Sequence, residues 1–426
     1  MLNQDSFDVV RSKRTGKHFT APVYDSYCFA QIPQTIRYCL TDDTRCGVPF
    51  TTGDPLSEKY DTVILFFIDA FGWRFVERYL ERHPFLKRIL NEGVVDLLSS
   101  QFPSTTAAHV TAIHTGLNVG QSGVYEWNYY EPIVDSVISP LLFSFAGDED
   151  RDTLLRTGIA PTAFFPSHTV YQDLRNHGVN SYILQDSRYC HSPYTDIVTN
   201  GARVIPYRTF PEAIATLIEG LYNTQGKNYF FLYYDKIDAI CHRHGPNSLQ
   251  LAAEIETFLA VMEDFFHPNL AKHRGRTLFL MTADHGQVEI DPRTTIYLNR
   301  DCPEILPHLK RSGSGELLIP AGSPRDMFLH VKDGRWEEVI SMLEKPFEGR
   351  GEIRKTNELI AEGYFGSTSP SAELLSRIGD LVVLPYANES VWWLDPPRFD
   401  QHYYGHHGGL TPLEMETVLL AQPYVH

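Results

Sequence analysis

The segment DTVILFFIDAFG, residues 61–72, contains a continuous apolar run from Val63 to Ile68 that ends in Asp69 and a glycine-bearing turn. An uninterrupted run of this length is typical of a strand that is buried on both faces of a parallel sheet. In open α/β sheets ligands bind at the carboxyl ends of the strands, so a carboxylate there is a candidate functional group. The segment therefore predicts a buried parallel sheet with a site at one edge.

Helix and strand patterns alternate on both sides of this segment. The helix pattern WRFVERYLERHPFLKRIL and the strand pattern GVVDLLSSQ follow directly at residues 73–101. Three further strand patterns, NSYILQ, NYFFLYY and TLFLM, are separated by helix patterns, and two of them run into acidic and histidine residues. Such alternation predicts a parallel sheet with crossover helices. The late HGGLTP, residues 407–412, is predicted to be a tight loop that opens a final helix.

Differences in composition and pattern along the sequence divide the chain into three parts. Residues 1–58 are rich in turn formers and are interpreted as a lead-in that packs on the core. Residues 59–295 and 397–426 are predicted to form the catalytic α/β core, and residues 296–396, with many Gly and Pro turns, a smaller α+β insertion.

Composition and charge exclude several classes of protein. No segment approaches the roughly 18 apolar residues of a membrane span and the N-terminus lacks the apolar run of a secretory signal, so we expect a soluble cytoplasmic protein with no membrane partner. Its six cysteines show no CxxC pairs, which favours reduced thiols over disulfides. A formal net charge of -16 without a basic run argues against long nucleic acids as partners.

A second segment, FPSTTAAHVTAIHTG at residues 102–116, places three hydroxyls at the start of a predicted helix. Unsatisfied backbone N–H groups and the helix dipole favour an anion such as phosphate at that end. Ser104, Thr105 or Thr106 could therefore supply a nucleophile, but a capping Ser or Thr would give the same pattern. The segment alone leaves both interpretations open.

Carboxylates and imidazoles recur at the predicted strand ends. DKIDAICHRHGP contains Asp238 and His242, which are spaced closely enough to share one ion, and TADHG contains Asp284 and His285. With Asp69 and the histidines of the late HHGG they form a candidate metal constellation without thiolates. Such a donor set suits two divalent ions, most often zinc, with manganese or iron as alternatives. Three carboxylates against two divalent cations leave a charge of about +1, which suits a phosphodiester or phosphonate anion.

These motifs together resemble the alkaline phosphatase superfamily, in particular its type I phosphodiesterase/nucleotide pyrophosphatase branch. The resemblance extends from about Asp61 to the C-terminus through VILFFIDAFG, FPSTTAAHVTAIHTGLNVGQSGVYEWN, DKIDAICHRHGP, TADHG and GHHGGL. It implies an α/β fold, an alkaline-phosphatase-like sandwich with a central, mostly parallel sheet flanked by helices. No CxPxR sulfatase signature occurs, so the same comparison argues against sulfate ester hydrolysis.

The resemblance also implies roles for individual residues. Thr106, ten residues before Gly116 of the Thr-Gly pair, matches the nucleophile. His407 is preferred over His406 because the ligand directly precedes glycine in relatives. The first metal would be held by Asp69, Thr106, Asp284 and His285, and the second by Asp238, His242 and His407.

Three further residues are candidates for substrate contacts. His109 stands where nucleotide pyrophosphatases usually carry an asparagine that donates to a phosphate oxygen, which argues against nucleotide substrates. Tyr125 and Trp127 lie in the aromatic segment GVYEWNYYEP. That segment predicts either alternating strand packing or a wall that stacks a planar substrate group.

The function that the resemblance implies is a metal-dependent hydrolase of phosphodiester, pyrophosphate or phosphonate bonds that acts through a phospho-threonine intermediate on a small-molecule substrate. The first alternative is a phosphoryl transferase or mutase of the same superfamily, which would use the same metals. The second is a metal-holding interaction protein without turnover.

Overall fold

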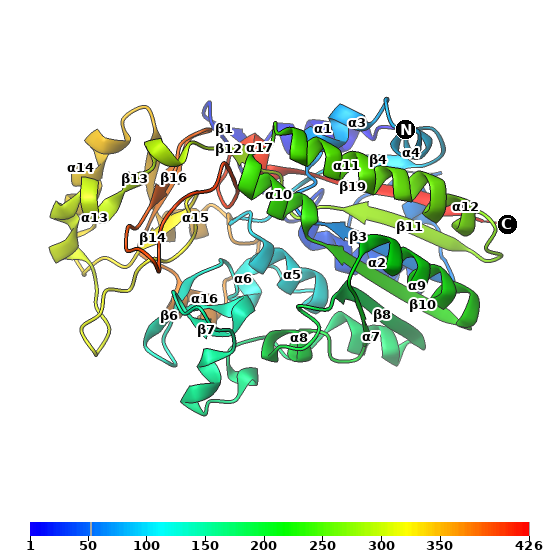
Figure 1. Ribbon diagram of the computed structural model, residues 1–426, viewed down its shortest axis with the longest axis horizontal. Helices are drawn as coiled ribbons and strands as arrows, with labels where there is room; N and C mark the ends of the chain where they lie inside the picture. The colour runs from blue at the N-terminus through cyan, green and yellow to red at the C-terminus, as the bar shows by residue number, and fades with distance from the viewer. Residues whose placement is uncertain (52, 426) are drawn as a thin grey trace.

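A seven-stranded sheet forms the centre of the computed structural model, which describes residues 1–51 and 53–425 (Figure 1). Its strand order is β4-β19-β11-β3-β10-β8-β9. The strands are β3 (Thr62–Ile68), β4 (Val94–Ser99), β8 (Val179–Asp186), β9 (Arg203–Tyr207), β10 (Lys227–Tyr234), β11 (Thr277–Thr282) and β19 (Glu416–Tyr424). From β11 to β9 neighbouring strands are parallel, whereas β19 is antiparallel to both β11 and β4. The predicted central, mostly parallel sheet is confirmed.

The apolar run of β3 exists because helices cover both faces of the sheet. Phe66 contacts Phe210 of α9 (Phe210–Asn223) on one face. Its neighbour Phe67 points to the other face, where it contacts Phe29, which in turn packs against α5 (Thr106–Thr115). All seven residues of β3 are buried, so the strand has no solvent-facing side on which every second residue could be polar.

The other core helices connect consecutive strands. They are α3 (Trp73–Tyr79), α4 (Pro84–Glu92), α6 (Val119–Ser122), α7 (Val170–Asn176), α8 (Pro193–Val198), α10 (Lys236–His244), α11 (Leu249–Val261) and α12 (His267–Leu270). A small antiparallel sheet of β5 (Tyr129–Glu131), β6 (Ser136–Ser139) and β7 (Ser144–Phe145) follows α6.

The N-terminal residues lie against the β4 edge of the sheet. They contain α1 (Gln4–Arg11), the pair β1 (Arg14–Thr15) and β2 (Phe19–Thr20), and α2 (Ile32–Leu40). Leu2 forms an isolated bridge with Val95 and Cys28 with Ser99, both residues of β4. This part of the chain therefore covers an edge that would otherwise be free.

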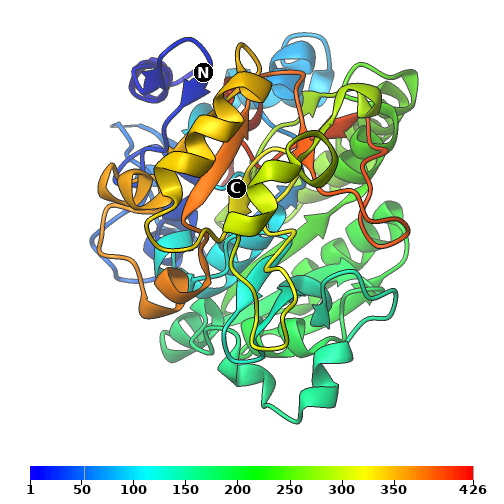
Figure 2. The same cartoon turned by 90° about the vertical axis from the view of Figure 1, so that its left-hand side faces the viewer.

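A second, smaller layer of structure lies at one end of the molecule (Figure 2). Its sheet has the antiparallel order β14 (Met327–Leu329), β16 (Leu381–Pro385), β15 (Gly351–Lys355), and α14 (Trp336–Phe347) packs beside it. Leu329, Leu343 and Val383 belong to a buried cluster separate from the main core. The remaining elements here are β13 (Ile296–Tyr297), α13 (Leu298–Asp301), α15 (Thr356–Ala361), α16 (Ala372–Arg377) and β17 (Val391–Trp392).

Two expectations about helices are wrong. The helix pattern of residues 73–90 is divided into α3 and α4, because Pro84 cannot donate a backbone hydrogen bond and His83 caps the second helix by accepting from the Phe85 N–H. The predicted final helix is the single turn α17 (Pro412–Met415), and the chain then enters β19. Thr411 and Glu414 form a capping box that starts the helix, but the following ETVLLAQPY favours a buried strand.

The cysteines at 28, 39, 46, 190, 241 and 302 are free, as the sequence predicted. Among the described residues, no helix combines the length and the apolar character that crossing a bilayer requires.

Candidate active site

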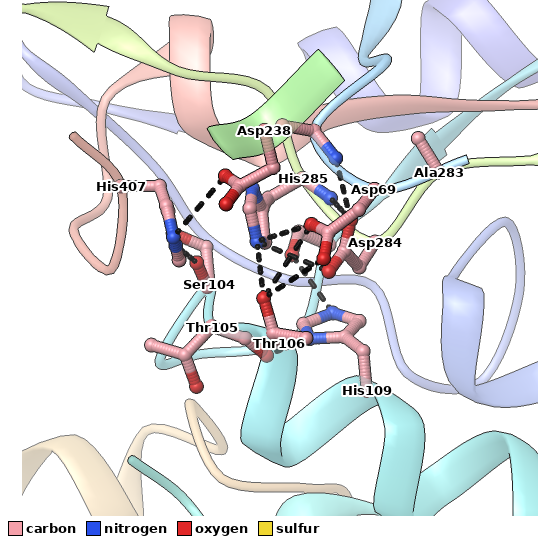
Figure 3. A network of polar contacts seen from close by, with 12 residues as sticks. Asp69, Ser104, Thr105, Thr106, His109, Asp238, Ala283, Asp284, His285 and His407 are labelled. Carbon is pink, nitrogen blue, oxygen red and sulfur yellow. Dashed lines mark hydrogen bonds and ion pairs between the residues drawn. The ribbon is translucent and has the colours of Figure 1, made fainter. Parts of the chain in front are cut away.

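The predicted metal ligands meet at the carboxyl edge of the central strands (Figure 3). Asp69 directly follows β3, Asp238 lies in the first turn of α10 after β10, and Asp284 and His285 follow β11. Because β3, β10 and β11 are parallel neighbours, their carboxyl ends lie side by side. Residues more than 200 positions apart in the sequence are brought together in this way.

One group of ligands consists of Asp69, Asp284 and His285, all buried. The His285 Nε2 lies 3.1 Å from the Asp284 Oδ2 and 3.7 Å from the Asp69 Oδ1. The Asp284 Oδ1 accepts hydrogen bonds from the Ala70 and His285 backbone N–H groups, each at 3.0 Å. The Asp284 Oδ2 makes no hydrogen bond, so a buried carboxylate oxygen faces the group without a donor.

The second group is formed by Asp238, His242 and His407. The Asp238 Oδ1 lies 3.4 Å from the His242 Nε2 and 3.7 Å from the His407 Nε2. His407 and Asp238 also form a ligand cluster with His285, so His285 lies between the two groups. His406, the alternative to His407, has its Nδ1 2.9 Å from the backbone carbonyl oxygen of His407 and belongs to neither cluster.

The protonation of the three imidazoles fits metal ligation. The Nδ1 atoms of His242, His285 and His407 lie 2.7, 3.0 and 2.9 Å from the backbone carbonyl oxygens of Gly405, Gly286 and Ser104. A carbonyl can only accept, so each Nδ1 carries a proton and each Nε2 is the nitrogen that faces the carboxylates. An Nε2 without a proton requires a cation between it and the carboxylate, because two lone pairs repel at such distances.

Electrostatics lead to the same conclusion. Burial raises the pKa of the Asp69 carboxyl well above its ordinary value, and the charges of Asp284 and Asp238 raise it further. Three carboxylates in one buried site are therefore costly on their own. The ligand atoms of Asp69, Asp284 and His285, and those of Asp238, His285 and His407, lie within 4.8 Å of one another, while the His242 Nε2 belongs to neither cluster and lies 3.4 Å from the Asp238 Oδ1. Shifts of a few tenths of an ångström would bring each set within reach of a cation with bonds of about 2.0–2.2 Å. The residues present thus fit two divalent cations.

The three hydroxyls of the segment 102–116 have different partners. The Ser104 Oγ donates to the Gly409 carbonyl at 2.7 Å and the Thr105 Oγ1 to the Tyr125 carbonyl at 2.9 Å. The Thr106 Oγ1, at the first residue of α5, lies 3.4 Å from both the Asp69 Oδ1 and the His285 Nε2. Thr105 is the N-cap residue but makes no side-chain capping bond. Of the three, Thr106 alone faces the ligand group.

Two cavities meet at Thr106. The smaller cavity, of about 230 Å³, and the larger cavity, of about 550 Å³, share Thr106, Trp127, Leu142 and Asp238 in their walls. His242 and His407 line the larger cavity, and Asp69 lines the smaller one. A phosphorus atom near Thr106 could therefore carry one substituent in each cavity.

The three predicted substrate contacts are placed differently. Trp127 is 45% exposed and lines both cavities, as a wall for substrate groups would. Tyr125 is fully buried, stacks on Tyr129 and donates its hydroxyl to the Arg377 carbonyl, and it lines neither cavity. Tyr125 therefore packs in the interior, but it lies in the loop before β5 and not in a strand, so the predicted strand alternation is wrong at this position.

His109 is also enclosed by protein groups. Its Nε2 accepts from the Gln101 N–H at 3.0 Å and lies 2.9 Å from the Ser100 Oγ, and its Nδ1 lies 2.7 Å from the Thr105 carbonyl oxygen. Burial lowers the pKa of the imidazole to about 4, so it is neutral. In this arrangement no free nitrogen is left for a phosphate oxygen, and His109 instead ties α5 to the end of β4.

Two residues that hydrogen-bond to the candidate metal ligands were not predicted from the sequence motifs. The Tyr233 hydroxyl donates to the Asp69 Oδ2, and the Gln287 side-chain amide donates to the Asp238 Oδ1. Both are close to recognised positions: Tyr233 is the penultimate residue of β10 and Gln287 follows Asp284 by three positions. The position of Tyr233 near the end of a strand could have indicated a role in the site, but in the sequence this residue belongs to an aromatic and apolar run that is typical of a buried strand.

A buried ion pair fixes the loop that carries His407. Arg325 and Glu414 have fully buried side chains, with the Arg325 Nε 2.9 Å from the Glu414 Oε1. Glu414 also accepts from the backbone N–H groups of Gly409 and Thr411 at 3.0 and 3.2 Å. At Gly408 the φ angle is +126° and a Cβ would lie 2.4 Å from the Ser323 Oγ, so the loop requires glycine there.

Comparisons with known proteins show the family and the fold of this chain. A family profile described as Type I phosphodiesterase / nucleotide pyrophosphatase matches residues 63–410. No curated protein sequence matches the chain. Murine ectonucleotide pyrophosphatase/phosphodiesterase 5 superimposes with a TM-score of 0.62 at 17% identity over 84% of this chain and 87% of that one. Phosphonoacetate hydrolase from Sinorhizobium meliloti, solved with phosphonoacetate, gives 0.60 at 17% identity over 84% and 89%. An inactive alanine variant of the murine protein, with the same similarity, was solved with AMP.

Proposed function

Because the chain belongs to the type I phosphodiesterase/nucleotide pyrophosphatase family of the alkaline phosphatase superfamily, we propose that it hydrolyses phosphodiester, pyrophosphate or phosphonate bonds with two divalent cations and Thr106 as the nucleophile. The observation that carries the proposal is the position of the Thr106 Oγ1, 3.4 Å from Asp69 and His285 and at the junction of two cavities. Zinc is the cation that this set of imidazoles and carboxylates suits best.

The cations, when bound, would offset the carboxylate charge and supply Lewis-acid stabilisation of phosphoryl oxygens. Asp69, Asp284 and His285 would hold one, with Thr106 beside it, and Asp238, His242 and His407 the other. Tyr233 and Gln287 orient Asp69 and Asp238 through their hydrogen bonds.

The reaction has two steps. In the first, the Thr106 oxygen forms a bond to phosphorus, the bond from phosphorus to the leaving oxygen or carbon breaks, and the proton of the hydroxyl passes through solvent to the leaving group. In the second, a water oxygen forms a bond to phosphorus, the bond between phosphorus and the Thr106 oxygen breaks, and one proton of the water restores the hydroxyl. The N-terminus of α5 points unpaired backbone N–H groups towards the phosphoryl oxygens during both steps.

The test compares Thr106→Ala with Thr105→Ala, whose neighbouring hydroxyl is engaged with the Tyr125 carbonyl. Turnover of bis(4-nitrophenyl) phosphate is measured with zinc or manganese. Thr106→Ala should fold and keep most of its metal but lose several orders of magnitude in kcat, whereas Thr105→Ala should keep most of the activity. Acid quench should trap phosphate on Thr106, and ¹⁸O from labelled water should enter the product. Label-free product would favour a transferase, and metal-dependent turnover that survives in Thr106→Ala would contradict the proposal.

A further inference from the structure

The smaller cavity differs in chemistry from the metal-lined site that it adjoins. Asp69, Thr106 and Asp238 close one end of it. Away from that end its walls combine apolar or aromatic side chains with a few polar ones. The former are Val110, Leu141, Leu142, Tyr194, Val198 and Phe231, and the latter include Gln185, Ser192, Thr195 and Thr199. A group of the substrate that enters this cavity therefore leaves water for a mainly apolar surface.

Charged groups in the outer part of the cavity are few. Among the described residues that line it, Arg151 is the single cationic side chain, and it is exposed at the rim. Asp235 also lines the cavity, and its charge is offset by Arg188, at 2.8 Å, and by Lys236, at 2.9 Å. The interior therefore offers no cluster of cations for a second phosphate, and a charged substituent would be poorly accommodated there.

His114 is the polar group of this wall that lies on the nucleophile helix. The hydroxyls of Ser192, Thr195 and Thr199, which also line the cavity, donate to the Thr195 hydroxyl and to the Tyr189 and Thr195 carbonyls. His114 lies two turns after Thr106 on α5 and is 5% exposed, with its Nδ1 2.6 Å from the Tyr171 hydroxyl. Burial lowers the pKa of this imidazole to about 3, so it is neutral. Among the described residues, the hydrogen-bond contact of this imidazole is that of its Nδ1 with Tyr171, and its Nε2 is the other ring nitrogen of a side chain that lines the cavity.

The proton of this imidazole can be assigned from its neighbour. Tyr171 is fully buried and burial raises the pKa of its phenol, so the hydroxyl keeps its proton and must donate it. Among the described residues, the His114 Nδ1 is its hydrogen-bond partner. The Nδ1 therefore accepts, and the Nε2 carries the N–H of this side chain, which lines the cavity.

We propose that the smaller cavity binds one organic substituent of the phosphorus, an uncharged group of ring size that carries a hydrogen-bond acceptor, and that the His114 Nε2–H recognises this acceptor. The inference rests on the proposed function, whose substrate class it narrows. A cavity of about 150 Å³ is known to accommodate benzene, so about 230 Å³ holds a ring with a small substituent.

The test uses calorimetric binding of three phosphonates to the zinc-loaded protein: methylphosphonate, phenylphosphonate and 4-acetylphenylphosphonate. Each has a single organic group, so its location is not ambiguous. Phenylphosphonate should bind at least about tenfold more tightly than methylphosphonate, because its ring leaves water for the mainly apolar wall of the cavity. The acetyl oxygen should add about fivefold through a neutral hydrogen bond.

Variants then assign these gains to residues. His114→Leu should remove the acetyl gain and leave the affinity for methylphosphonate unchanged, and His114→Gln, which keeps a donor, should restore part of it. Tyr171→Phe should give a partial loss, because either imidazole nitrogen can then carry the proton. Val198→Ala, in the same wall, should weaken both aryl compounds equally, and Arg398→Ala, in the larger cavity, should change neither ratio.

Two results would overturn the inference. A phenyl group that gains nothing over methyl would remove the cavity as its site, and an acetyl gain that persists in His114→Leu would remove His114 as the donor. Turnover of bis(4-nitrophenyl) phosphate by the same preparation reports separately on the proposed function, so the two failures are distinguishable.

Discussion

Replacing Arg325 by Met should destabilise the protein and release the second metal together. The guanidinium donates from its Nε and Nη2 to Glu414, at 2.9 and 3.0 Å, and from its Nη1 and Nη2 to the Tyr386 and Pro385 carbonyls, at 2.8 and 3.2 Å. It also donates to the Glu389 carbonyl. Methionine fills much of the space but leaves the buried Glu414 carboxylate without its countercharge.

The expected magnitude follows from this geometry. Breaking a buried ion pair by removing one partner costs about 3–5 kcal/mol. Glu414 keeps the backbone N–H groups of Gly409 and Thr411, which places the cost at the lower part of that range, while the carbonyls left without a donor add to it. We expect about 4 kcal/mol of lost unfolding free energy.

The second expected effect of Arg325→Met, loss of the second metal ion, arises in the loop that Glu414 holds. Gly409 and Thr411 belong to the same loop as His407, so its Nε2 should no longer be held near Asp238. Denaturant unfolding gives the stability change, and elemental analysis gives the metal content, which should fall from about two to about one ion per chain. Arg293→Met, which breaks an exposed pair with Asp291, is the control and should change neither quantity.

A double variant separates pairing from packing. Arg325→Met with Glu414→Leu removes both charges, so the two losses should be less than additive by about 1–3 kcal/mol. A single variant within about 1 kcal/mol of the natural protein that also keeps both metals would refute the role assigned to this pair.

Three further predictions concern separate parts of the molecule. Asp238→Asn should lower the metal content by about one ion, because Asp69, Asp284 and His285 remain, and loss of both ions would contradict two separable sites. Trp127→Ala should raise KM for aryl phosphodiesters more than for a small dialkyl ester, whereas equal losses with a lower Tm would favour packing. Asp96→Asn should stabilise the protein at pH 8 but not at pH 4. Burial and the charge of Asp54 raise the pKa of Asp96 to about 8, against about 3.9 in unfolded chains, so between these values the folded state holds a proton that the unfolded state has released. The contribution of Asp96 to the free energy of unfolding is complete below about pH 4 and falls as the pH rises to 8, by an amount on the order of a few kcal/mol. If the free energy of unfolding changes equally with pH in Asp96→Asn and in the natural protein, the raised pKa is contradicted.

The sequence predicted the parts of the site that are encoded locally. Asp69 and Asp284 stand at the ends of apolar runs, and a run that must be buried on both faces also fixes where its strand ends. The one-turn helix α17 shows the opposite case. Its capping box is a correct local signal for a helix start, and the apolar ETVLLAQPY favours a strand, but the early end of the helix and the pairing of that strand with β4 and β11 depend on distant residues.

The sequence predicted the surroundings of individual side chains less well than it predicted where the strands end. Tyr125 and Trp127 are two positions apart in one aromatic segment, yet the first is buried beneath Arg377 and the second is exposed between two cavities. The role of His114 depends on Tyr171, more than 50 residues later. Contacts of this kind arise from tertiary packing.

The position of β19 has a consequence for the order of events during synthesis. β4 leads into the nucleophile segment, but its strand neighbour in the sheet is β19, formed by residues 416–424. On the ribosome β3, β10 and β11 can pair as they emerge, while β4 must wait for a segment made more than 300 residues later. Chains that end before Glu416 lack this strand partner of β4, so we expect nascent chains released before that residue to expose apolar surface and to depend on chaperones.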